Sequence, residues 1–245
     1  MILILAHTQD EPAQWLFNRL SSGQSQILLL SDLDLIEATQ WLHYLSNNKT
    51  ETSFCLKNGQ KVELAKVQMI INRLQYIYPV HWTGSSDKER NYAQQEYHAF
   101  FASWLQAYQG ILYNPPTVNS LCGTNPGKIV WLSMAKISGF RIPENSFYVN
   151  SDNNISDDIL FRASSELKIA VVLDHEVINA PPAYINACLR LSGKTNLPLL
   201  CIYFIKDQQN NWSFAGATPL PDFKLLPPEF LVSLHKKINA IYAEQ

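Results

Sequence analysis

Four polar side chains of this 245-residue chain stand where a ligand could reach them: His7, Arg73, Asn114 and Lys128. His7 and Arg73 each follow an apolar run, and ligands of open α/β sheets bind at the ends of strands. Lys128 precedes a helical pattern, where a lysine could face a phosphate. Asn114 opens an Asn-Pro-Pro loop that Pro115 and Pro116 make rigid by restricting φ. A plainer role stays open for each: a cap or surface residue, a surface salt bridge, a structural loop and a solvated lysine.

The elements that would position these side chains alternate between strand and helix. Continuous apolar runs predict strands buried on both faces, at Met1–Leu5, Ile27–Leu30 and Val67–Asn72. Helical spacing predicts helices at Glu11–Leu20, Leu35–Leu45, Tyr92–Tyr108 and Lys128–Ser138. Asn58-Gly59 between apolar flanks predicts a hairpin turn. The alternation predicts an open α/β sheet.

The C-terminal part is predicted to contain strands joined by tight turns. Ile169–Ile178 is predicted to form two strands that turn at Asp174-His175. Further strands are predicted at Leu199–Ile205 and Trp212–Pro219, and helices at Pro182–Leu191 and Pro227–Ala243. The polar stretch Ser151–Asp158 is the best candidate for a linker.

Charge and motif content exclude several classes of function. The net charge is −2 and no run of Lys or Arg is present, so a nucleic-acid partner is not expected. No segment is apolar for long enough to predict a membrane span, and no signal peptide is indicated. Four scattered cysteines without a C-x-x-C motif favour free thiols in a reducing cytoplasm. The six histidines lack metal-ligand spacing, and no motif for a catalytic nucleophile is found.

The order of features from residue 114 to residue 145 resembles one family. Asn114-Pro115-Pro116, then Lys128 at the start of a helix, then Gly139-Phe140-Arg141-Ile142-Pro143 are similar to the junction in ATP-grasp ligases, in the branch of RimK-like and peptide-maturing ligases. Asp174–Ile178 and Phe214–Asp222 resemble strands of the same family. The resemblance implies an α/β fold with three parts: an N-terminal open parallel-sheet (pre-ATP-grasp) domain over 1–115, a junction over 116–150, and a reduced α+β ATP-grasp-like domain over 151–245.

Two features of the family are missing from this sequence. Only about twenty residues, Ser151 to Lys168, lie where the family has its nucleotide lid, and a crossover unit alone needs a dozen or more. Gly216 and Thr218 stand where the resemblance implies a Glu and an Asn that hold Mg²⁺. The resemblance therefore implies a protein truncated in its catalytic middle, with no catalytic residue, no metal ligand, and neither ATP nor Mg²⁺ as cofactor.

Three hypotheses of function follow. The first is a non-catalytic ATP-grasp-like protein, a pseudoenzyme, that binds a peptide or small ligand or pairs with an active ligase. The alternative is a minimal ATP-dependent carboxylate–amine ligase, with Lys128 and Arg73 contacting phosphate or substrate. The third is a structural homodimer, suggested by the many aromatic residues of the helix at Tyr92–Tyr108.

Overall fold

The computed structural model describes residues 1–22, 26–47, 49–78, 84–143, 166–206 and 209–243. The chain divides into two compact units, Met1–Thr124 and Asn125–Gln245. The three-part division expected from the sequence stays a prediction. The predicted linker Ser151–Asp158 and most of the shortened interval lie outside the described residues, so the missing lid also stays a prediction.

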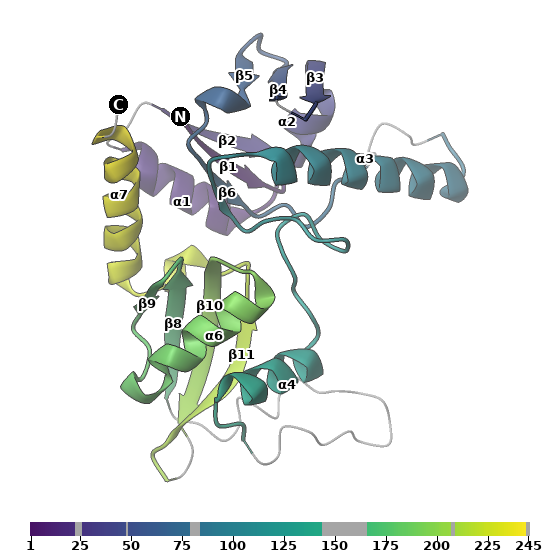
Figure 1. Ribbon diagram of the computed structural model, residues 1–245. Helices are drawn as coiled ribbons and strands as arrows, with labels where there is room; N and C mark the ends of the chain where they lie inside the picture. The colour runs from purple at the N-terminus through teal and green to yellow at the C-terminus, as the bar shows by residue number, and fades with distance from the viewer. Residues whose placement is uncertain (23–25, 48, 79–83, 144–165, 207–208, 244–245) are drawn as a thin grey trace. The chain divides into compact units, whose positions relative to one another are not determined.

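Unit 1 is built on a parallel sheet with the strand order β2-β1-β6-β7 (Figure 1). Its strands are β1 (Ile2–Ala6), β2 (Ile27–Ser31), β6 (Met69–Asn72) and β7 (Ile111–Tyr113). All residues of β1 and β6 are buried, as expected for strands covered on both faces. The open parallel sheet predicted from the apolar runs is confirmed.

Local capping interactions fix where the helices of unit 1 begin. The helices are α1 (Glu11–Ser21), α2 (Asp32–Glu37) and α3 (Asp87–Ala107). Asp10 caps α1 by accepting a hydrogen bond from the Ala13 N–H. Both α2 and α3 start with a capping box, in which a serine and an acidic residue three positions later satisfy each other's backbone N–H groups.

The helix expected at Leu35–Leu45 is wrong. Helix α2 ends at Glu37, and an antiparallel sheet of β3 (Thr39–Leu45), β4 (Thr50–Cys55) and β5 (Lys61–Glu63) follows, before the short 3₁₀ helix η1 (Leu64–Lys66). The rings of Trp41 on β3 and Phe54 on β4 stack with their centroids 4.2 Å apart. This cross-strand contact favours the strand over the local helical pattern. The hairpin turn at Asn58-Gly59 is confirmed, with Gly59 at φ +84°.

The aromatic side chains of α3 pack inside unit 1. Phe100 and Phe101 meet the ring of Trp41 edge-on, at centroid distances of 5.1 and 5.6 Å. Trp104 is buried in the same cluster. The small antiparallel sheet therefore covers much of the aromatic face of α3, while Tyr92 near the start of the helix is exposed.

His43 on β3 makes the stability of unit 1 sensitive to pH. Its Nδ1 lies 2.8 Å from Thr52 Oγ1 and its Nε2 lies 3.0 Å from Ser103 Oγ on α3, and burial lowers the pKa of the ring below its ordinary value of 6.5. A lowered pKa means that the unfolded chain takes up the proton more readily. The contribution is therefore complete above about pH 6.5 and is lost as the pH falls below it. We expect the urea midpoint to drop between about pH 7.5 and pH 5.5, and His43→Gln to reduce that drop. His175→Gln, at an exposed turn of unit 2, is the control and should leave the pH dependence unchanged.

Unit 2 is an antiparallel sheet with the strand order β11-β10-β8-β9, drawn with α6 across its face in Figure 1. The strands are β8 (Leu167–Leu173), β9 (Glu176–Ile178), β10 (Leu199–Lys206) and β11 (Trp212–Thr218). The helices are α4 (Lys128–Ser138), α6 (Ile185–Thr195) and α7 (Pro228–Ala243), with 3₁₀ turns η2 (Pro182–Tyr184) and η3 (Phe223–Leu225). Apolar residues of α4 and α6 share one core with the sheet. The predicted bounds of α4 are confirmed, because Gly139 at φ +97° ends the helix in the left-handed conformation.

Two expectations about compartment meet the structure only in part. All four cysteines are free thiols, and the cytoplasmic location that they favour stays a prediction. Within the part of the chain that the structure describes, no helix has both the length and the apolar character needed to cross a membrane.

Candidate functional site

Polar side chains lie close together at the carboxyl ends of β1, β2 and β6 in the parallel sheet of unit 1. We call this end of the sheet its carboxyl edge. His7 follows β1, Asp32 follows β2 and Arg73 follows β6. Strand β1 lies between β2 and β6. The chain runs from β1 to β2 on one side and later returns to β6 on the other, so the order of the strands reverses at β1. In open α/β sheets a point of this kind is the usual place for a ligand.

Arg73 forms a buried ion pair with Asp10. Its Nε donates to Asp10 Oδ2 at 2.8 Å and its Nη2 donates to Asp10 Oδ1 at 3.1 Å. Only 6% of the Arg73 side chain and 12% of the Asp10 side chain are exposed. Because Asp10 also caps α1, the pair ties the end of β6 to the start of that helix. The structure thus gives Arg73 a carboxylate partner inside the protein, and its role toward a ligand stays a prediction.

His7 packs between an acidic and an aromatic side chain. Its Nδ1 lies 3.2 Å from Asp32 Oδ2, and its ring centroid lies 4.6 Å from that of Tyr76. Among the described residues its Nε2 atom is buried without a hydrogen-bond partner. Burial by itself raises the pKa of Asp32, but hydrogen bonds from Thr8 and His7 outweigh it, so that pKa lies below its ordinary value. Asp32 is therefore an ionised carboxylate at neutral pH.

Asn114 is a fully buried residue of the loop that follows β7. Its carbonyl oxygen accepts a hydrogen bond from Asn72 Nδ2 at 3.2 Å, and the peptide bond between Tyr113 and Asn114 is cis. Asn72 also donates to the carbonyl of Leu121. The loop is thereby held against the end of β6, which fits the structural alternative for Asn114 as well as a place in a pocket wall.

The fourth candidate, Lys128, belongs to unit 2, where it is the first residue of α4. The structure therefore brings His7 and Arg73 to one edge of the sheet in unit 1 and places Asn114 on the loop after the neighbouring strand β7. The ligand roles predicted for all four side chains stay predictions.

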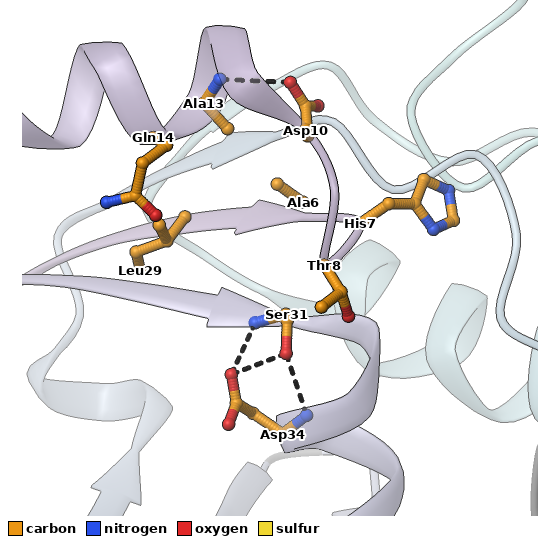
Figure 2. A pocket seen from close by; sticks show the side chains of 9 residues that line it. All are labelled: Ala6, His7, Thr8, Asp10, Ala13, Gln14, Leu29, Ser31 and Asp34. Atoms are coloured by element: carbon orange, nitrogen blue, oxygen red, sulfur yellow. Dashed lines mark hydrogen bonds between the residues drawn. The ribbon is translucent and has the colours of Figure 1, made fainter.

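A small pocket opens at the same edge, at the start of α1 (Figure 2). It has a volume of about 250 Å³ and is lined by residues from the ends of β1 and β2 and the starts of α1 and α2. Figure 2 shows the Asp10 carboxylate on one side and Asp34 on the other, with Ala6 and Thr8 between them. Neither Asp10 nor Asp34 was among the site residues predicted from the sequence. The spacing of Ser31 and Asp34 matches a capping box, and that signal would have placed an acidic residue next to a strand end.

The metal-ligand positions suggested by the resemblance lie on β11 of unit 2. Ala217 packs into the core with α4 and α6, so the neighbouring positions, Thr218 and the side-chain-free Gly216, belong to the opposite face of the sheet. On that face Tyr203 is paired with Gly216, and Cys201 with Thr218. Burial raises the pKa of Cys201 to about 12, which keeps the thiol neutral. Within the residues that the structure describes, no three His, Cys, Asp or Glu side chains are grouped so that they could hold a metal ion.

Comparison with known proteins identifies similar structures but no close relative. No protein-family model matches the chain, and no curated protein matches it significantly. The macrocyclase MdnC from Microcystis aeruginosa MRC, bound with the precursor peptide MdnA, is 14% identical with a TM-score of 0.67, over 95% of this chain and 96% of that chain. A RiPP-associated ATP-grasp ligase from Chryseobacterium gregarium, in complex with ADP and a leader and core peptide, is 13% identical with a TM-score of 0.62, over 91% and 90%. The ATP-grasp ligase PsnB with its minimal precursor is 12% identical with a TM-score of 0.64, over 90% of each chain.

These matches correct the expectation about cofactors. Two further structures of PsnB contain ADP and Mg, and a third contains AMPPNP. Nucleotide and metal binding are therefore typical of this fold, and the expectation of a protein that uses neither ATP nor Mg²⁺ was wrong. The expectation relied on the residues at two strand positions, Gly216 and Thr218. The similarity of the whole fold to structures that contain nucleotide and Mg outweighs these two positions. The described residues do not by themselves form a coordination site for the metal from three or more His, Cys, Asp or Glu side chains.

Proposed function

The chain has the fold of the ATP-grasp ligases, and from this premise we propose that the protein binds a peptide as a binding or partner subunit in peptide modification. One observation carries the proposal: the fold extends over nine-tenths or more of three ligase structures, each solved with a precursor or with a leader and core peptide. The pocket at the carboxyl edge of the sheet in unit 1 supports it, because it offers a place for a side chain of the ligand.

In this proposal the chain has a binding role and no chemical step of its own. Nucleotide binding is compatible with this role, because holding ATP does not require transferring its phosphate. The protein could fill this role as a homodimer as well as in a pair with a separate ligase.

Selection from a random library of displayed 12-residue peptides tests the proposal. We expect the protein to enrich a consistent sequence pattern, and resynthesised peptides to bind with micromolar or better dissociation constants in fluorescence anisotropy. An unrelated α/β protein of similar size carried through the same rounds is the control. Enrichment that does not exceed this control would contradict the proposal.

A minimal ATP-dependent carboxylate–amine ligase is the second candidate, favoured by the nucleotide and Mg in structures of the same fold. In that case an enriched peptide that carries both a carboxyl and an amino side chain should lose the mass of one water as an amide bond forms between them, while ATP, in the presence of Mg²⁺, is cleaved to ADP and phosphate. Lys128→Ala should abolish both signals, whereas Lys136→Ala, an exposed lysine of the same helix, should not. Peptide binding without phosphate release would favour the non-catalytic role.

A further inference from the structure

The pocket at the start of α1 has the size of one side chain. Its volume is about 250 Å³, below the roughly 300–1,000 Å³ of typical small-molecule sites. Ala6, Ala13 and Leu29 supply apolar surface, whereas Thr8, Gln14, Ser31 and Asp34 supply polar atoms. Such a pocket suits a group with an apolar stem and a polar end.

The start of α1 is not prepared to bind an anion. Helix starts bind phosphate through free backbone N–H groups, but here the first turn has none to offer. The Ala13 N–H donates to Asp10 Oδ1 at 3.0 Å, and the Gln14 N–H donates to the Asp10 carbonyl at 3.1 Å. The Glu11 N–H donates to a loop carbonyl at 3.0 Å, and Pro12 has no N–H. A carboxylate at the cap position also disfavours a second negative charge.

The hydroxyl groups of the pocket have likewise used their donors. Thr8 Oγ1 donates to Asp32 Oδ1 at 2.7 Å, and Ser31 Oγ donates to Asp34 Oδ2 at 2.6 Å. The second oxygen of Asp34 takes part in none of these bonds. Asp34 also has no cationic partner among the described residues, unlike Asp10, which is paired with Arg73. Besides the Gln14 amide and the His7 ring, which also line it, the pocket therefore presents hydrogen-bond acceptors and a carboxylate charge to a ligand.

From this geometry we propose that the pocket binds a cationic group, an ammonium or a guanidinium, with its alkyl stem against Ala6, Ala13 and Leu29. Lysine and arginine side chains have this form, with an apolar stem and a charged end that stays near water. Asp34 is exposed at the rim, where such an end would lie. The inference rests on the proposed function in one respect: the cationic group is taken to belong to a basic residue of the bound peptide.

Titration with N-acetyl-lysine methylamide, followed by backbone amide shifts in nuclear magnetic resonance, tests the pocket directly. We expect the largest shifts at Thr8, Ser31 and Asp34, and weaker binding at higher salt. N-acetyl-arginine methylamide and n-butylamine distinguish a guanidinium and a free amine from a lysine side chain. The norleucine analogue, which keeps the stem without the charge, should not bind.

Asp34→Asn should raise the dissociation constant about fivefold, the size expected for one ion pair near the surface. Glu89→Gln is the matched control, because it removes the charge from the other capping box of unit 1. It should alter the stability of its helix to a similar extent and leave the binding unchanged. Equal binding by norleucine, shifts confined to other residues, or no effect of Asp34→Asn would overturn the inference.

The outcomes separate this inference from the proposed function. If the selected peptides bind without a basic residue, or if Asp34→Asn leaves their binding unchanged, the cationic pocket is wrong and peptide binding stands. If lysine analogues bind at Thr8 and Ser31 while no peptide is enriched, the pocket stands and the peptide as its source is wrong.

Discussion

Replacing Arg73 by methionine is expected to lower the free energy of unfolding of unit 1 by about 3–5 kcal/mol, the cost of removing one partner from a buried ion pair. The loss follows from what stays behind. Asp10 keeps a carboxylate of which 12% is exposed, and the two N–H groups that Arg73 donates to it are gone. Because Asp10 also caps α1 and lines the pocket, the start of that helix should lose protection as well. Urea unfolding and hydrogen exchange of the peptides covering β1 and α1 measure both effects.

The double variant Asp10→Asn, Arg73→Met separates the charge from the packing. An asparagine keeps an oxygen that can accept the Ala13 N–H but leaves no buried charge, so most of the stability should return. Lys57→Met is the control at an exposed ion pair with Glu37 and should change the stability by less than about 1 kcal/mol. If Arg73→Met were as stable as the wild type, the buried Asp10 carboxylate would not need the ion pair with Arg73.

Local patterns were sufficient to predict the parts of the fold in which a segment carries its own boundary signals. Strand β1 is apolar throughout, and both its faces are covered. Helix α4 begins at Lys128 and ends at Ser138, before Gly139, whose positive φ only glycine adopts without cost. Asn58-Gly59 gives the hairpin between β4 and β5. In each case the residues that decide the structure are neighbours in the sequence.

The region from residue 35 to residue 45 shows where local patterns fail. Ala38, Trp41 and Leu45 have helical spacing, but Trp41 gains its contacts from Phe54 and from α3. Those partners are remote in sequence, and their packing outweighs a weak local preference. The chain therefore leaves the helix at Ala38, which is extended with ψ 144°.

The candidate site was predicted only in part, for a related reason. Strand ends can be found from apolar runs, and so His7 and Arg73 were found. Their carboxylate partners lie 25 and 63 residues away, and nothing in the sequence pairs them. Asp10 caps α1, and Asp34 completes the capping box that Ser31 begins at α2. A local role is therefore sufficient to explain each carboxylate and conceals the pocket that they share.

Asn72 is the second position at which a substitution should lower the free energy of unfolding by several kcal/mol. The change to aspartate replaces only the amide nitrogen by an oxygen. The side chain is 2% exposed, and its Nδ2 donates to the carbonyls of Asn114 and Leu121 while its Oδ1 accepts the Leu74 N–H. Asn72→Asp would place a carboxylate oxygen against two carbonyl oxygens with no donor between them. Burying an unpaired charge in this way should cost about 3 kcal/mol or more at neutral pH. The loop that contains Asn114 and Leu121 should exchange its amide hydrogens faster.

The pH dependence of Asn72→Asp distinguishes this electrostatic cost from a loss of packing. The fold disfavours the ionised form of the new carboxyl, so its pKa in the folded state lies above the ordinary value near 4. The folded protein then holds the proton more tightly than the unfolded chain, and the penalty relative to the wild type should shrink as the pH falls from about 7 toward 4.5. Asn179→Asp makes the same change at an exposed amide that donates to the Ile169 carbonyl, and it should alter the stability by less than about 1 kcal/mol at either pH. A penalty at position 72 that is constant with pH would mean that the shape of the side chain, and not its charge, decides how the loop is held at the end of β6.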